Sequence, residues 1–584
     1  QRGCSAARMP WEVCPRAASA GESGGPPSDP PVYPPRIDAT APRALHPQRR
    51  STIGLAATWM AAAPLAFAAL GIDSAAAQEP YPFLVPGGST RLEIPGIFSS
   101  HSSLYRTSDA DAALEELGGP YTGTVGPTVF PALAGFEEAV RRAGQEGYRA
   151  ALGSMESFME RSQVRVPFSI DVGVFDWLTA GIVVPAVHSD VEFALDFDAD
   201  STGANAGFSP DSASVYDFLD ALGSSIGEFD GHQKNVCTAD PNSSECIRAT
   251  AALGGAVTFQ SALSAMYGTL FAPLAWSEAG GALQSRLAEL DAIFEAAGVG
   301  GLPDSVPLAD ELMVRADFLE LISNPVHGIG ATTPEGRWRP GWRLGDIELR
   351  VNTRLYDSGG DADERGIEAG LGTLVRLPTA VQADPASLVD VGTGDDQMDV
   401  EVRGWLNARL GGGSGIWAGY RHGVQLGGTT IRRAFDPSVT FAPLSTQATL
   451  EWDPGDYRVV DLAPWYRVSG SLTLLAGYRH RGKGPDSFAL AAAAGEDGEP
   501  SPDAPEGPPP DPKILVANSE SSSGRLLLGI VYNRATTNPE DGSVGRPLEI
   551  RFTYRRVVAG SGGVPKSRSL EAGFRFYADL WRGT

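Results

Sequence analysis

Apolar and polar residues alternate along three consecutive segments between residues 341 and 410. In the third segment Val400 and Val402 are apolar, while Glu401 and Arg403 occupy the intervening positions. A period of two is typical of a β-strand, and each run has about ten residues, which is what a tilted strand needs to cross a bilayer. Because similar runs recur to the end of the chain, the pattern predicts an all-β transmembrane antiparallel β-barrel with helical insertions.

About twelve strands are expected in this barrel. They lie near residues 88–97, 164–175, 178–198, 341–356, 365–378, 397–410, 415–430, 456–468, 471–482, 523–534, 547–559 and 568–581. Short turns at 175–177, 411–414 and 469–470 are expected to face the periplasm. The longer polar connections between strands, at 200–340, 380–396, 431–455 and 484–521, are then expected outside the cell.

The polar faces of these strands are expected to line the lumen, and the apolar faces to contact lipid. The lumen-lining candidates are Glu348, Arg350, Arg354, Glu401, Arg403, Trp405, Arg409, Arg479, Arg551, Arg555 and Arg575. Two interpretations of the charges remain open. Opposite charges on neighbouring strands pair and make the lumen rigid, or the arginines form a constriction that attracts anions.

Aromatic residues mark the edges of the expected membrane region. The sequence Ala-Gly-Tyr-Arg-His occurs twice, at residues 418–422 and 476–480. Tyrosine rings favour the interface between lipid and water, so an aromatic girdle is expected there. We assign to it Tyr420, Tyr478, Tyr532 and Tyr554. A site formed by the two histidines of the repeats is the less favoured alternative.

The N-terminal region carries the pattern of an export signal. Residues 1–45 are rich in Pro, Gly, Ser and Ala and are interpreted as a disordered or mis-translated extension. Arg49 and Arg50 then precede a long apolar run that ends in alanines at 75–77. This order is typical of a secretory signal peptide, which we place at 46–77, and a retained membrane anchor is the alternative. Export and the barrel pattern together predict the bacterial outer membrane.

Two regions carry helical periodicity instead. Residues 78–163 are expected to hold the first strand and a helical segment, and the barrel over 164–584 is interrupted by a helical insertion at 200–340. So long an insertion is expected either to plug the lumen or to cap it outside. Within it, Cys237 and Cys246 are expected to form a disulfide in an exported protein, and two free thiols are the alternative.

Composition narrows the function. The formal net charge of −25 argues against a nucleic-acid surface, which needs clustered cations. The mean hydropathy of −0.12 agrees with a barrel, because half of each strand faces water. No catalytic motif is present, and the acidic stretch 196–203 lacks the closing glutamate of a calcium loop. We therefore expect neither enzyme activity nor a cofactor or bound metal.

The last strand is amphipathic and rich in aromatic residues. In this respect residues 568–581 resemble the recognition signal for the barrel-assembly machinery of the outer membrane. That signal ends on an aromatic residue, whereas residues 582–584 follow Trp581 here. The assembly machinery is still an expected partner through this strand.

Three stretches resemble a group of Gram-negative outer-membrane proteins, the transporters assigned to the meta-pathway of phenol degradation, which are distantly related to the long-chain fatty-acid channel. They are SIDVGVFDWLTAGIVVP, LGDIELRVNTRLYD, and LVRLPTA followed by VGTGDDQMDVEV. The resemblance covers roughly residues 165–200 and 340–410. Ala380 stands where the group has glycine, and the helical insertion is not typical of it. The resemblance implies passive uptake of small hydrophobic compounds, aromatic ones among them.

Three functions are compatible with this sequence. The first is a channel for a small hydrophobic solute in contact with outer-membrane lipid. The second is a structural or surface-binding barrel whose helical insertion binds a partner. The third is a membrane hydrolase of the outer-membrane phospholipase kind. It is disfavoured because His422 and His480, which are expected to face outward, have no evident serine partner.

Overall fold

The computed structural model describes residues 83–106, 114–199, 203–326, 328–359, 364–395, 397–436, 438–491, 509–517, 519–534 and 548–580. The expected N-terminal extension and signal peptide, 1–77, lie outside these residues, as do the last four residues of the chain.

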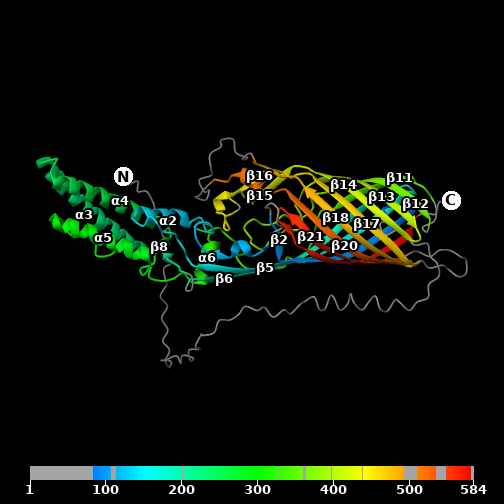
Figure 1. Ribbon diagram of the computed structural model, residues 1–584, viewed down its shortest axis with the longest axis horizontal. Coiled ribbons are helices and arrows are strands. Elements are labelled where there is room, and N and C mark those ends of the chain that lie inside the picture. Colours follow the sequence, from blue (N-terminus) through cyan, green and yellow to red (C-terminus); the bar gives the residue numbers. More distant parts are fainter. Residues whose placement is uncertain are drawn as a thin grey trace, which may run out of the picture. The chain divides into compact units, whose positions relative to one another are not determined.

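Within the described residues, twelve strands close into an antiparallel β-barrel. In order around the ring they are β1 Ser89–His101, β5 Ser154–Phe175, β6 Leu178–Asp198, β11 Glu348–Asp357, β12 Arg365–Arg376, β13 Asp399–Gly411, β14 Ser414–Gln425, β17 Tyr457–Ser469, β18 Leu472–Lys483, β20 Ser521–Arg534, β21 Leu548–Ser561 and β23 Arg568–Asp579. Strand β1 pairs with β5 on one side and with β23 on the other, which closes the ring. Figure 1 shows these strands side by side. The predicted fold class and strand count are confirmed.

Alternation sorts the side chains of every barrel strand onto two surfaces. On β13, Glu401 and Trp405 are buried inside the barrel. Val402 and Leu406, each of which directly follows one of them, are exposed on the outside. On the other strands, too, the positions that face outward are largely apolar. They include Leu349, Val351, Ile367, Leu371, Ile416, Val460, Leu462, Leu474, Leu528, Ile530, Phe574 and Phe576. An exposed apolar surface of this extent is what a barrel in lipid requires.

Short strands extend or flank the barrel. Strands β9 Gly336–Trp338 and β10 Trp342–Leu344 pair with β6, and β4 Gly123–Thr124 pairs with β5. Three small sheets consist of β15 Gly428–Arg433, β16 Gln447–Asp453 and β19 Ser487–Leu490; of β2 Ser103–Tyr105, β3 Leu114–Glu116 and β22 Val564–Pro565; and of β7 Ala206–Phe208 and β8 Phe271–Pro273. The connections expected as polar loops at 431–455 and 484–521 thus contain strands.

Five α-helices lie in the described residues: α2 Leu133–Arg142, α3 Ser212–Ala239, α4 Ser244–Tyr267, α5 Glu278–Ala296 and α6 Arg315–Ser323. Three short 3-10 helices are η1 Gly119–Tyr121, η2 Leu444–Thr446 and η3 Pro512–Val516. Side-chain oxygens of Asp211, Ser243 and Ser277 accept backbone N–H groups at the starts of α3, α4 and α5, as good N-caps do. Among these described helices, none is both long enough and apolar enough to span a membrane.

The helices share one buried core with the far ends of β5 and β6. Phe193 and Phe197 of β6 belong to this core, and the Phe197 ring stacks on Phe318 of α6 with centroids 4.5 Å apart. Tyr267 of α4 is partly buried against it, and burial raises the pKa of its hydroxyl, which stays protonated and donates to the Pro307 carbonyl at 2.6 Å. Strands β5 and β6, of 22 and 21 residues, therefore belong both to the barrel and to the helical part of the chain.

Two sequence predictions of secondary structure were wrong. The helical segment expected within residues 78–163 contains only the α-helix α2, because Gly144 adopts a φ of 119° and ends the helix, and residues from Ser154 onward belong to β5. The strand expected at 341–356 is split into β10 and β11. The Asp346 side chain between them turns inward and accepts the backbone N–H groups of Thr379 and Ala380, at 3.2 and 3.0 Å.

The structure joins Cys237, at the end of α3, to Cys246, at the start of α4. We predict that replacing both cysteines by serine lowers the free energy of unfolding of the helical part by about 2–3 kcal/mol, because the unfolded chain regains the freedom of a short closed loop. Thermal unfolding followed by circular dichroism at the helical band measures this. The barrel's resistance to detergent on unheated gels is expected to be unchanged, and a helical transition at the wild-type temperature would contradict the prediction.

Candidate functional site in the barrel lumen

Three tryptophans lie together on the lumen wall. Trp405 is on β13, Trp417 on β14 and Trp465 on β17, and all three are buried in one cluster. Two of the rings lie against an inward-facing glycine of a neighbouring strand. A Cβ atom on Gly370 would lie 2.5 Å from the Trp405 ring, and one on Gly415 would lie 2.5 Å from the Trp465 ring. Glycine thus leaves the space that a flat indole needs to rest on the wall.

The N-terminal segment of the chain enters this aromatic cluster. The Phe83 ring stacks on both Trp405 and Trp417, with centroids 5.6 and 5.8 Å apart. Two residues later Val85 is fully buried, and its backbone N–H donates to Thr179 Oγ1 at 2.8 Å. We call the three tryptophans together with Phe83 the aromatic cluster. One of its four rings comes from a segment that belongs to no strand.

The entering segment is held at the turn between β5 and β6. The backbone N–H of Gly87 donates to Asp176 Oδ1 at 2.9 Å, and that of Gly88 donates to the Gly173 carbonyl at 2.8 Å. A Cβ atom on Gly173 would lie 2.0 Å from the Pro86 carbonyl oxygen, so this close approach requires glycine. Residues 83–88 therefore reach the aromatic cluster from the end of the barrel where this short turn lies.

A buried carboxylate joins three strands of the lumen wall. Asp171 of β5 is fully buried and binds two arginines. Arg91 Nη2 of β1 lies 2.8 Å from Oδ2, while Arg350 of β11 donates from Nε to Oδ1 at 2.7 Å and from Nη2 to Oδ2 at 2.6 Å. Strand β6 places Gly181 opposite Asp171, where a Cβ atom would lie 1.9 Å from Oδ1. One row of groups thus ties β1, β5 and β11 together, and Gly181 of β6 leaves the space that the carboxylate occupies.

Each charged lumen candidate has an ion-pair partner among the described residues. The pairs are Glu348 with Arg165 and Arg376, Arg350 with Asp171, Arg354 with Asp357 and Glu368, Glu401 with Arg403 and Arg421, Arg409 with Asp357, Arg479 with Asp461, Arg551 with Glu549, Arg555 with Glu571, and Arg575 with Glu93 and Glu549. This arrangement favours the interpretation of a rigid, charge-paired lumen over an unpaired arginine constriction. Of the candidates, only Trp405 lies in the aromatic cluster.

The four tyrosines assigned to the girdle share the outward parity of their strands. Tyr420, Tyr478 and Tyr554 are exposed, and Tyr532 is half-buried. His422 of β14 also takes the outward parity, and its Nε2 lies 3.8 Å from Asp456 Oδ2.

Sequence reasoning missed four residues of the site. Trp417 and Trp465 have the inward parity of β14 and β17, so the alternation alone could have identified them. Asp171 has the inward parity of β5, but its two arginines come from strands far away in the sequence. Phe83 lies in a stretch without periodicity, so no signal in the sequence places it against Trp405.

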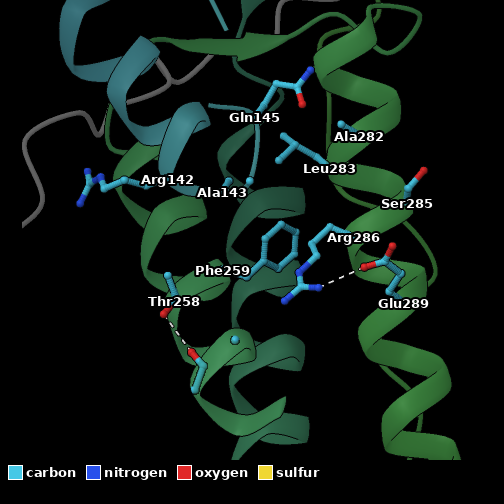
Figure 2. Close-up of a pocket in the computed structure, with 13 residues that line it drawn as sticks. Arg142, Ala143, Gln145, Thr258, Phe259, Ala282, Leu283, Ser285, Arg286 and Glu289 are labelled. Atoms are coloured by element: carbon cyan, nitrogen blue, oxygen red, sulfur yellow. Dashed lines mark hydrogen bonds and ion pairs between the residues drawn. The ribbon is translucent and has the colours of Figure 1, made fainter. Parts of the chain in front are cut away.

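A groove of about 630 Å³ lies away from the barrel strands, between α2, α4 and α5. Figure 2 shows Arg286 beside the Phe259 ring, with its guanidinium group joined to Glu289. Two of its polar side chains already have partners: Arg286 Nη1 donates to Glu289 at 3.0 Å, and the Thr258 hydroxyl donates to the Gly254 carbonyl at 2.8 Å. The lumen is the better candidate site, because its aromatic cluster includes a ring from residues 83–88, which belong to no strand.

No protein-family model and no curated protein sequence matches the chain. Solved structures with a similar arrangement include an outer membrane channel from Pseudomonas putida F1, at 9% identity and a TM-score of 0.36, covering 86% of this chain and 100% of that one. A toluene transporter from Ralstonia pickettii has 8% identity and a TM-score of 0.25, covering 85% and 90%. A FadL homologue from Pseudomonas aeruginosa has 8% identity and a TM-score of 0.22, covering 84% and 90%. Sequence identities and TM-scores this low assign no residue and no solute to this chain.

We predict that Asp171→Asn lowers the free energy of unfolding of the barrel by about 3–5 kcal/mol, because two guanidinium groups on the wall lose their shared negative charge. Urea unfolding in lipid vesicles, followed by tryptophan fluorescence, measures the loss.

Asp456→Asn is the matched control. Asp456 is half exposed and only 3.8 Å from His422, so the same chemical change is expected to cost less than about 1 kcal/mol. If Asp171→Asn were as stable as this control, the row that joins β1, β5 and β11 would not hold the wall together.

Proposed function

We propose that the chain is an outer-membrane channel for passive uptake of small hydrophobic compounds, aromatic ones among them. The observation that carries the proposal is the stacking of the Phe83 ring on both Trp405 and Trp417 inside the barrel. Stacked aromatic pairs favour ring separations of this size, so the cluster is shaped to hold a flat aromatic group. In the resting chain the group it holds is one of the protein's own side chains.

The way Phe83 is held supports its replacement by a solute. Residues 83–88 belong to no strand. The backbone N–H groups of Val85, Gly87 and Gly88 tie this segment to β6, to the turn after β5 and to β5. An aromatic solute that enters the lumen can stack on the same two indoles once the segment withdraws. The concentration gradient of the solute then drives passage, and the paired charges of the wall keep the lumen open in one shape.

The apolar outer surface and the closed ring support insertion in the outer membrane, with lipid as the surrounding partner. Strand β23 closes the barrel against β1 and is amphipathic, which supports recognition by the barrel-assembly machinery. The core of the helices contains the ends of β5 and β6 and none of the three lumen tryptophans. We infer that the helical insertion caps the extracellular side and that residues 83–88 act as the plug.

We predict that Phe83→Ala binds ethylbenzene about tenfold more tightly than the wild-type chain. The wild-type site is free only in the fraction of molecules whose segment has withdrawn, and this fraction divides the apparent affinity. Isothermal titration of the refolded full chain in detergent, corrected for partition into empty micelles, gives both constants.

Phe158→Ala is the control, because Phe158 lies on the outer parity of β5 and is 45% exposed. Its ethylbenzene affinity is expected to equal that of the wild type. The proposal would be wrong if no chain bound ethylbenzene, or if Phe83→Ala bound it no better than Phe158→Ala.

A further inference from the structure

Two buried hydrogen-bond donors, one in the aromatic cluster and one two residues away on β13, have no partner among the described residues. Trp405 Nε1 and Asn407 Nδ2 are buried, and neither atom meets an acceptor in the described chain. Their side chains are 7% and 2% exposed. A buried donor without an acceptor is unfavourable, so such a pair at one place needs a physical explanation.

The two donors lie at the wall where Phe83 stacks. Trp405 and Asn407 are two residues apart on β13 and share its inward parity. Trp405 is one of the two indoles that hold the Phe83 ring. The Asn407 amide is oriented by one hydrogen bond, in which Trp465 Nε1 donates to Asn407 Oδ1 at 3.1 Å. Its Nδ2 is therefore the atom left without a partner.

Phe83 can satisfy only part of this site. Its ring provides the flat surface that Trp405 and Trp417 stack on, but a phenylalanine side chain has no hydrogen-bond acceptor. The resting chain therefore matches the apolar part of the site and leaves both donors unpaired. A solute that carries an acceptor beside its aromatic ring would match both parts.

We propose that the lumen selects aromatic solutes that carry a hydrogen-bond acceptor, such as a carbonyl oxygen, over plain aromatic hydrocarbons. Trp405 and Asn407 are the specificity-determining residues, and their N–H groups donate to the acceptor. This inference rests on the proposed function, since it names the class of solute that takes the place of Phe83. A site built to donate a hydrogen bond rejects an analogue that lacks the acceptor, because the donors are then left unpaired.

The test compares two compounds of nearly the same shape, acetophenone and α-methylstyrene, in which a carbonyl oxygen replaces a methylene group. Each is titrated into the refolded full chain in detergent, and each constant is corrected for partition into empty micelles. The wild-type chain is expected to bind acetophenone about tenfold more tightly than α-methylstyrene.

Asn407→Asp is the decisive variant. It keeps the Oδ1 acceptor for Trp465 and the shape of the side chain, but it removes the Nδ2 donor. The preference for acetophenone is expected to fall well below tenfold, because only the Trp405 N–H is left to donate, and wild-type mobility on unheated gels reports an intact fold. Trp405→Phe keeps an aromatic ring without its N–H and is expected to reduce the preference.

Asn533→Asp is the matched control for adding a carboxylate to the lumen, because Asn533 has the inward parity of β20 and lies outside the aromatic cluster. It is expected to keep the tenfold preference. Equal affinities of the wild-type chain for the two compounds would overturn the inference and leave the proposed function standing, with water as the partner of the donors. Binding of neither compound would overturn both.

Discussion

Closure of the ring through β1 is the constraint on which the rest of the structure depends. In a bilayer every backbone N–H and C=O group must be paired within the protein, and a sheet achieves this only when it has no free edge. Strand β1 provides the last two pairings, with β5 and with β23, although its neighbours lie far apart in the sequence. Once the ring is closed, each residue faces either lipid or lumen according to its parity alone.

The lumen wall uses this sorting to hold charges and rings in fixed places. Asp171 binds Arg91 and Arg350 and so joins three strands, and Gly181 leaves room for its carboxylate. In the same way, Gly370 and Gly415 leave room for the Trp405 and Trp465 indoles. The small residues matter because a Cβ atom at these positions would occupy the space of the neighbouring group. A charge-paired wall thus carries a flat aromatic surface that residues 83–88 cover.

Much of the barrel could be predicted from the sequence, because parity is a local property. Alternation places Glu401 and Trp405 inside and Val402 outside, as the structure does. Local exceptions escaped the pattern. Gly144 ends a helix that the apolar spacing would continue, and Asp346 breaks a strand by bonding backbone groups more than thirty residues later.

The candidate site could be predicted only in part. The inward charges follow from parity, but their pairing depends on which strands are neighbours and in what register. Phe83 and Trp405 are in contact although they lie far apart in the sequence. The segment around Phe83 also has no periodic pattern. A contact of this kind can be identified only when the three-dimensional arrangement of the strands is known.

The most direct test of the account places 4-fluorophenylalanine at position 83 and records the fluorine resonance by nuclear magnetic resonance. Stacking of the ring on two indoles predicts a resonance shifted from the position of the free amino acid. Saturating ethylbenzene is expected to move it to that free position as the solute takes the place of the ring. A resonance at the free position without solute, or one that stays shifted while ethylbenzene binds, would contradict the central claim that Phe83 occupies the solute site.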